Sequence, residues 1–214
     1  MSETFETRRE AILTEIGDKS VTLVAVSKKQ SDQRIIGALE VGQRIFGENR
    51  VQEAQQHWAV RRVEFPDLEL HLIGPLQTNK TADAVALFDI IETLDRPKLA
   101  RALAREIERS GRTLEIYIQV NTGEEPQKAG VSAAGLDGLL TEARDECGLN
   151  VTGLMCIPPI GEPAGPHFAL LAKLAKMHGL ANLSMGMSDD YMTATLFGAT
   201  HVRIGTGLFG ARET

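Results

Sequence analysis

Eight short apolar runs, each separated from the next by a longer amphipathic segment, set the strongest limit on how this chain can fold. The expected strands span residues 21–26, 44–47, 68–73, 90–94, 114–121, 151–157, 183–187 and 201–204. The expected helices lie near 3–17, 32–42, 50–61, 77–87, 96–108, 132–147, 164–178 and 189–198. Strands that alternate with helices indicate an α/β fold with a parallel sheet, because parallel strands need a crossover connection.

The even spacing of these strands favours a closed barrel. The chain has 214 residues, or about 27 for each strand, which is compact but sufficient for a (β/α)8 TIM barrel. No linker or shift in composition marks a second domain, so we expect residues 1–214 to form one domain, with a helix within 1–18 before the first strand. A doubly wound open sheet is the alternative.

The run LEIYIQVN at 114–121 predicts which residues point into the barrel. Its two faces alternate, one apolar (Leu114, Ile116, Ile118 and Val120) and the other more polar (Glu115, Tyr117, Gln119 and Asn121). Helices should cover the apolar face, so the polar face points inward. The same alternation sends His201 and Arg203 inward. Barrel interiors are usually apolar, and a polar interior suits a bound polar cofactor.

Lys28 follows the first expected strand, within VAVSK at 24–28. A lysine at the mouth of a barrel can form a Schiff base with a carbonyl compound, especially where burial or a neighbouring cation favours the neutral amine. The alternative is an ordinary solvated lysine at the start of a loop. We expect the adjacent Lys29 to be such a residue.

Two loops near the end of the chain predict a phosphate site. Ser188 follows the expected strand 183–187 and is well placed to cap the next helix. Gly205 and Thr206 follow the last strand, and unpaired amides at neighbouring strand ends favour an anion. The segment GTGLFG also matches a dinucleotide-binding pattern, but the chain ends at Thr214, which leaves no room for the required helix and strand.

Arg203 and Asn49 complete the candidate site. Arg203 points inward and needs an acceptor, because guanidinium offers only donors. That acceptor is either an inward acid such as Glu115 or a ring nitrogen of a cofactor. Asn49 follows the second strand and either caps the next helix or faces the pocket. His71 and His201 are expected to be hydrogen-bonded interior residues.

Composition excludes several other classes of function. The formal charge of −6 argues against broad binding to nucleic acid or anionic membranes. Cys147 and Cys156 are the only cysteines, and the sequence contains no CxxC or HExxH spacing, so we expect no metal site. The N-terminal segment is polar and no apolar run approaches membrane-spanning length. We expect a cytoplasmic protein, and we expect it to be a monomer.

Several motifs resemble one family in order across nearly the whole chain. They are VAVSK at 24–28, FGENRVQE at 46–53, HLIGPLQTNK at 71–80, LDRPKLA at 94–100, QVNTGEEPQKAG at 119–130, GLMCIPP at 153–159, and the segments LSMGMSDD and VRIGTGLFG. The chain resembles the pyridoxal-phosphate homeostasis proteins (the YggS/PROSC family). It departs from that pattern at Pro75, where we expect histidine in many members, and in a short N-terminus.

The resemblance implies a barrel like the N-terminal domain of alanine racemase, with pyridoxal 5′-phosphate held as an internal aldimine on Lys28. It implies that the phosphate lies on Ser188, Gly205 and Thr206, that Arg203 faces the pyridine nitrogen, and that Asn49 lies near the ring. The implied role is to carry and buffer the cofactor in vitamin B6 and amino-acid homeostasis, with enzymes that need the cofactor as candidate recipients.

We expect no significant turnover and no catalytic residue. Arginine remains charged and therefore leaves the pyridine nitrogen unprotonated, which weakens the electron sink that pyridoxal phosphate supplies. Alanine racemase takes its second acid–base tyrosine from a partner's second domain, and neither Tyr117 nor Tyr191 is an evident substitute. An amino-acid racemase-like enzyme is the main alternative. A cofactor-free aldolase that uses Lys28 on a sugar phosphate is a further one.

Overall fold

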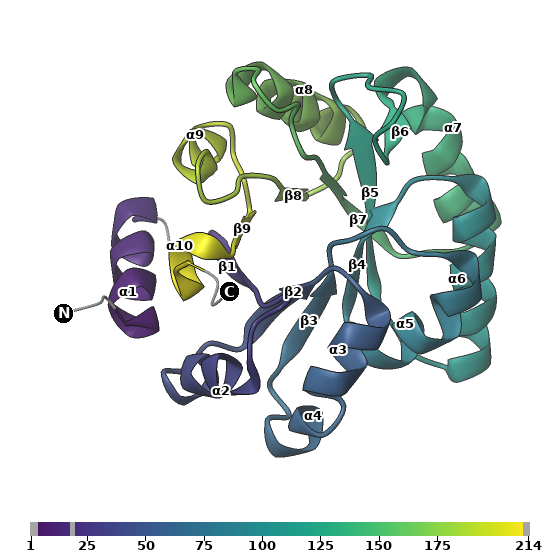
Figure 1. Ribbon diagram of the computed structural model, residues 1–214. Helices are drawn as coiled ribbons and strands as arrows, with labels where there is room; N and C mark the ends of the chain where they lie inside the picture. The colour runs from purple at the N-terminus through teal and green to yellow at the C-terminus, as the bar shows by residue number, and fades with distance from the viewer. Residues whose placement is uncertain (1–3, 18–19, 212–214) are drawn as a thin grey trace.

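Eight parallel strands form a closed ring in the computed structural model, which describes residues 4–17 and 20–211 (Figure 1). The strands are β1 (Thr22–Val26), β2 (Ile45–Glu48), β3 (Glu69–Leu72), β4 (Ile90–Leu94), β5 (Glu115–Asn121), β7 (Val151–Met155), β8 (Asn182–Ser184) and β9 (His201–Ile204). Each pairs in parallel with the next, and β9 pairs with β1. The predicted (β/α)8 barrel is therefore confirmed, and the open-sheet alternative is wrong.

Helices surround the ring of strands (Figure 1). They are α1 (Phe5–Ile16), α2 (Asp32–Glu40), α3 (Val51–Trp58), α4 (Arg61–Glu64), α5 (Thr81–Leu87), α6 (Pro97–Ser110), α7 (Leu136–Thr141), α8 (Ala164–Met177), α9 (Tyr191–Leu196) and α10 (Thr206–Phe209). Shorter helical turns are η1 (Thr78–Lys80), η2 (Ala133–Gly135) and the π-helical η3 (Glu142–Glu146). The predicted helix near 3–17 is α1, and part of residues 1–18 lies outside the described residues.

Three short elements were not predicted from the sequence, namely helix α4, strand β6 and helix α10. Strand β6 (Val131–Ser132) pairs in parallel with the last residues of β5, where the chain returns after a loop. Helix α10 has one turn and follows β9 directly, where the sequence suggested only a glycine-rich turn. It lies beside α1, so the two ends of the described chain pack together (Figure 1).

The two faces of β5 lie where their alternation predicts. The apolar face packs in the main core against the surrounding helices, and its members Leu114, Ile116, Ile118 and Val120 are at most 3% exposed. On the opposite face, Tyr117 packs inside the barrel with Ile90 and Met155. Its ring also lies 5.7 Å from that of His201. The interior of the barrel therefore contains polar as well as apolar side chains.

Candidate functional site

The pairing of β1 with β2 places Lys28 beside Asn49. Val26 lies opposite Gly47 in this pair. Lys28 and Asn49 each follow two residues later, so they leave neighbouring strands at the same height. Both residues line a pocket at the mouth of the barrel, which is the end where the strands finish.

The pairing of β1 with β9 brings the end of the chain to the same mouth. Val24 lies opposite Arg203 in this pair, so the turn at Gly205 and Thr206 lies level with the end of β1. These residues line the same pocket as Lys28. Segments about 180 residues apart in the sequence thus meet because the barrel closes between its first and last strands.

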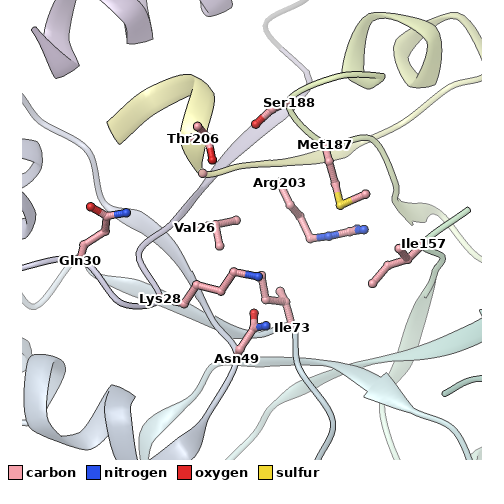
Figure 2. Close-up of a pocket in the computed structure, with 11 residues that line it drawn as sticks. Val26, Lys28, Gln30, Asn49, Ile73, Ile157, Met187, Ser188, Arg203 and Thr206 are labelled. Atoms are coloured by element: carbon pink, nitrogen blue, oxygen red, sulfur yellow. The ribbon is translucent and has the colours of Figure 1, made fainter. Parts of the chain in front are cut away.

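All six predicted site residues line this one pocket, whose volume is about 220 Å³. The lining residues are Val26, Lys28, Gln30, Asn49, Ile73, Ile157, Met187, Ser188, Arg203, Gly205 and Thr206. Figure 2 shows Lys28 and Asn49 on one side of the cavity and Ser188 and Thr206 on another, with the Arg203 side chain between them. The cavity thus combines an amine, a guanidinium group and a turn rich in backbone amides.

The turn that holds Lys28 is fixed by two carboxylates. The Ser27 hydroxyl donates to Glu48 Oε1 at 2.7 Å, and the Trp58 indole donates to the same oxygen at 3.0 Å. Burial raises the pKa of Glu48 despite these hydrogen bonds. Lys29 has a left-handed backbone with φ of 58°, and its amide donates to Glu53. Lys29 is exposed, as predicted, whereas Lys28 is half-buried.

Ser188 binds the last helix and does not cap α9. The predicted cap is wrong because Ser188 lies in a turn before α9, whose N-cap position is taken by Asp190. The hydroxyl of Ser188 instead accepts a hydrogen bond from the Gly207 amide in α10 at 3.3 Å. A Cβ at Gly207 would lie 2.9 Å from a side-chain atom of Ile204, the last residue of β9, so the turn from β9 into α10 leaves no space for a side chain there.

Asn49 faces the pocket and does not act as a cap. The N-cap position of α3 is Arg50, and the helix has no side-chain cap. A Cβ at Gly74 would lie 2.2 Å from the Asn49 carbonyl oxygen, so the loop after β3 packs directly on this residue. Glycine at 74 therefore allows the close approach that holds Asn49 at the pocket wall.

Arg203 is held by neutral acceptors from neighbouring strands and not by Glu115. Its Nη1 donates to Ser184 Oγ at 2.6 Å and its Nη2 donates to the Cys156 carbonyl at 2.9 Å. Glu115, which the sequence offered as one of two possible acceptors, does not pair with Arg203, because it begins β5 near the opposite end of the barrel, where Thr152 and Asn182 donate to it. The nearest carboxylate is Glu92, 3.8 Å from Arg203 Nη1.

A buried acid–base group lies beneath Arg203. His71 is completely buried and contacts Glu92 at 2.6 Å and Glu69 at 2.9 Å. Burial alone would lower the pKa of His71, but the hydrogen bonds to the two carboxylates outweigh it and raise the pKa to about 9. Burial alone would raise the pKa of Glu92, but the His71 hydrogen bond and charge lower it. His71 is therefore an imidazolium held between two carboxylates.

Several residues that shape the site were not predicted from the sequence. Gln30, Ile73, Ile157 and Met187 line the pocket, and nothing in their local pattern distinguished them from loop residues. Glu92 gave a clearer signal, because it is a single acid within the otherwise uncharged strand IIETL. An acid in the middle of a buried strand needs a partner in the interior.

The two tyrosines lie away from the pocket lining. Tyr117 is buried among the interior side chains, with its hydroxyl unpartnered, and Tyr191 donates from α9 to Glu15. Among residues 4–17 and 20–211, no helix is long and apolar enough to cross a membrane. The same residues contain no cluster of three histidine, cysteine or acidic side chains that could hold a metal ion.

Comparison with known proteins identifies the family. Residues 7–213 match the family model described as alanine racemase, N-terminal domain. A pyridoxal phosphate homeostasis protein of Pseudomonas aeruginosa is 40% identical over 202 residues, covering 91% of this chain and 86% of that protein. The one from Vibrio alginolyticus is 39% identical over 208 residues, covering 91% and 88%.

Solved structures agree in fold. PipY of Synechococcus elongatus, solved with pyridoxal phosphate bound, is 38% identical, with a TM-score of 0.87 over 97% of this chain and 100% of that one. Alanine racemase of Clostridium difficile shares the fold alone, with 11% identity and a TM-score of 0.78 over 99% of this chain and 57% of that one. The chain therefore belongs to the pyridoxal phosphate homeostasis protein family, whose barrel corresponds to the N-terminal domain of alanine racemase.

Proposed function

We propose that this protein binds pyridoxal 5′-phosphate in the pocket at the mouth of the barrel, with a covalent bond between the Lys28 amine and the aldehyde. The observation that supports this most directly is that Lys28, Arg203 and two turns, one at Ser188 and one at Thr206, meet at one cavity of about 220 Å³. The PipY relative supports it independently, since that protein was solved with the same cofactor bound.

The residues present fit the three chemical groups of this cofactor. The first amides of α10 have no carbonyl partner within that helix and, with the Ser188 hydroxyl, suit a phosphate dianion. Arg203 offers donors to a pyridine nitrogen, which is an acceptor. Asn49 lines the wall beside Lys28 and suits the polar ring substituents.

The same residues favour binding without turnover. Bound pyridoxal phosphate promotes reactions of amino acids by accepting electrons into a protonated pyridine ring. Arg203 donates its protons and keeps its own charge, so it holds the ring nitrogen unprotonated. Among the described lining residues, Lys28 and Arg203 are the only ionisable ones. A racemase needs a second acid–base group on the opposite face of the ring, and this pocket wall offers none in the described chain.

We propose that the protein stores and buffers the cofactor for enzymes that require it, as a cytoplasmic monomer. Relatives with 36–40% identity are named as homeostasis proteins and not as enzymes. The covalent bond between the Lys28 amine and the aldehyde forms with release of one water molecule and breaks when one is added. Such a bond suits this role, because it holds a reactive aldehyde reversibly.

The test is covalent mapping of the cofactor. Purified protein incubated with pyridoxal phosphate should show a visible absorbance band that borohydride reduction removes, and mass spectrometry should place the adduct on Lys28. Lys28→Ala should lose the band while keeping part of the affinity from the phosphate contacts. Lys29→Asn is the matched control, because asparagine tolerates the left-handed backbone at that position. An adduct mapped to any other lysine would refute the proposal.

A second measurement separates storage from catalysis. The loaded protein is incubated with L-alanine and other amino acids in deuterated water, and exchange of the α-proton is followed by NMR. We expect exchange close to that of free cofactor. Rapid exchange would establish the racemase-like alternative. An aldolase that uses Lys28 without a cofactor would show no visible band as purified, before pyridoxal phosphate is added.

A further inference from the structure

We infer that Ser184 and Glu92 are positioning residues that hold the Arg203 guanidinium in place against the pocket. This inference rests on the proposed function, because it assigns the two residues a role in contacting the cofactor ring. Neither residue lines the pocket, so both act through Arg203.

The Arg203 guanidinium is held at two points on neighbouring strands. Nη1 donates to Ser184 at the end of β8, and Nη2 donates to the carbonyl of Cys156, which follows β7. Arg203 is only 4% exposed, yet it lines the cavity. Figure 2 shows its side chain reaching across the pocket between Met187 and Ile157. Two fixed contacts on a rigid planar group give its remaining donors a defined direction.

The direction of the Ser184 hydrogen bond is set by Glu92. The Ser184 hydroxyl lies 2.5 Å from Glu92 Oε2 and 2.6 Å from Arg203 Nη1. An ionised carboxylate only accepts and a guanidinium only donates, so the hydroxyl must donate to Glu92 and accept from Arg203. With its single proton committed to Glu92, Ser184 presents a lone pair to Arg203.

Glu92 is held in turn from the far side. His71 contacts its other oxygen, Oε1, at 2.6 Å, and Glu69 contacts the second nitrogen of His71 at 2.9 Å. Side chains of alternating charge therefore run from Arg203 at the pocket through Glu92 and His71 to Glu69. The side chains of Glu92 and His71 are fully buried, whereas that of Glu69 is 41% exposed.

This arrangement explains why a buried carboxylate lies so close to the pocket without binding Arg203 directly. The distance from Glu92 to Arg203 Nη1 is 3.8 Å, and the hydroxyl of Ser184 bridges the two groups. A direct bidentate pair would take two of the five guanidinium donors for the carboxylate. The bridged arrangement balances the charge of Arg203 and leaves donors for a ligand.

The test measures ring binding separately from phosphate binding. Pyridoxine 5′-phosphate has the ring and the phosphate but no aldehyde, so it cannot bond to Lys28, and inorganic phosphate reports the amide turns alone. Ser184→Ala should bind pyridoxine 5′-phosphate about tenfold more weakly, as expected for a charge-assisted hydrogen bond. Its affinity for inorganic phosphate should stay within twofold of that of the wild type, a limit of roughly 0.4 kcal/mol.

Thr152→Val is the matched control, because Thr152 also donates from inside the barrel to a carboxylate, that of Glu115. It should leave both affinities unchanged. In a double-mutant cycle, Arg203→Gln should weaken ring binding, and Ser184→Ala should then add little further. Thermal melting of each variant checks that it folds. If the Ser184→Ala protein does not fold, Glu92→Gln replaces it, because glutamine keeps the side-chain volume but removes the charge.

The outcomes separate this inference from the proposed function. If wild-type protein binds neither pyridoxal phosphate nor pyridoxine 5′-phosphate, both fail. If it binds them and Ser184→Ala has no effect, only the inference fails. The inference also fails if Ser184→Ala weakens phosphate and ring binding equally, or if its effect persists in Arg203→Gln, since either result indicates a general structural role.

Discussion

At the scale of single residues, Gly207 leaves no space for a side chain between the first turn of α10 and the end of β9. A Cβ there would lie 2.9 Å from the branched side chain of Ile204 and 3.5 Å from Ser188 Oγ. Gly207→Ala should therefore displace the first turn of α10 and lengthen its hydrogen bond to Ser188. We expect affinity for pyridoxal phosphate to fall about tenfold, comparable with the loss of one charge-assisted hydrogen bond, as measured by fluorescence titration.

Gly138→Ala provides the control for this substitution. Gly138 lies in α7, and a Cβ there meets nothing within 4 Å. Alanine at a helical position that can accept it should raise the free energy of unfolding by up to about 1 kcal/mol and leave binding unchanged. Equal affinities for the Gly207→Ala and wild-type proteins would show that the close packing of Gly207 against Ile204 has no role in binding.

Residues at strand ends were predictable from the sequence, whereas their partners were not. Lys28 and Arg203 follow from the period-two pattern and the position of each strand end, and both line the pocket. The partner of Arg203 depends on the height of each residue within the barrel. Glu115 and Glu92 both point inward, but only Glu92 lies level with Ser184. Strand register fixes that height, and register is a tertiary property.

Strand register also decides which substitution of Arg203 is informative. Replacing it with glutamate would alter the charge next to a cofactor ring, but would place a second carboxylate beside the fully buried Glu92. Two buried like charges destabilise a fold or force one of them to protonate. Arg203→Gln avoids this cost and is therefore the informative variant.

At the scale of elements, the one-turn helix α10 depends on two arginines. Arg34 from α2 donates to the carbonyls of Phe209 and Ala211, and Arg8 from α1 donates to Leu208 at 2.6 Å. So short a helix is unstable alone, and cations at its C-terminus satisfy carbonyls that have no partner within it. The opposite end of α10 forms the phosphate turn, so these arginines support the pocket from behind.

Arg34→Gln should therefore weaken binding of the cofactor phosphate. Arg34 also donates to Gln30, which lines the pocket, at 2.7 Å. We expect a several-fold loss of affinity for pyridoxal phosphate, equivalent to roughly 1 kcal/mol, by titration with the folded variant. Arg109→Gln is the control, because Arg109 pairs with the neighbouring Glu106 on the surface of α6. Equal affinities of Arg34→Gln and Arg109→Gln for pyridoxal phosphate would contradict a role for the C-terminus of α10 in binding.

The sequence predicted all eight barrel strands but not α10. The run EIYIQVN keeps period two over seven residues, and IIETL is a short buried run of five, and either kind of run is enough to indicate a strand. Helix α10 has four residues, TGLF, and one of them is glycine. No periodic signal can develop over one turn, and the helix exists because α1 and α2 supply its partners.

At the scale of the whole molecule, barrel closure produces both the pocket and the buried charges. Pairing of β9 with β1 brings Lys28 and Gly205 to one mouth. The same closed ring encloses Glu92 and His71. The sequence predicted closure from even strand spacing. It could not predict which charges pair inside, because interior contacts join strands that are distant in sequence.

The charged interior should make stability depend on pH. The folded protein holds His71 as an imidazolium with a pKa of about 9, against an ordinary value of 6.5. Between these values the folded state binds more protons than the unfolded state, so the free energy of unfolding falls as pH rises. The stabilisation is complete below about pH 6.5 and lost by about pH 9, with a total near 3 kcal/mol. Urea unfolding of the apo protein across this range measures the slope.

His71→Gln should remove most of this slope while His201→Gln retains it. Both residues are interior imidazoles, with ring centroids 5.7 Å apart. Burial, aided by the charge of His71, lowers the pKa of His201 below its ordinary value of 6.5. The unfolded state therefore binds more protons at His201 near pH 6.5, which gives a slope of the opposite sign there, and above about pH 7.5 His201 is largely neutral in both states and contributes little. A slope that persists in His71→Gln would mean that the proton resides elsewhere, and that Glu92 is balanced by Arg203 alone.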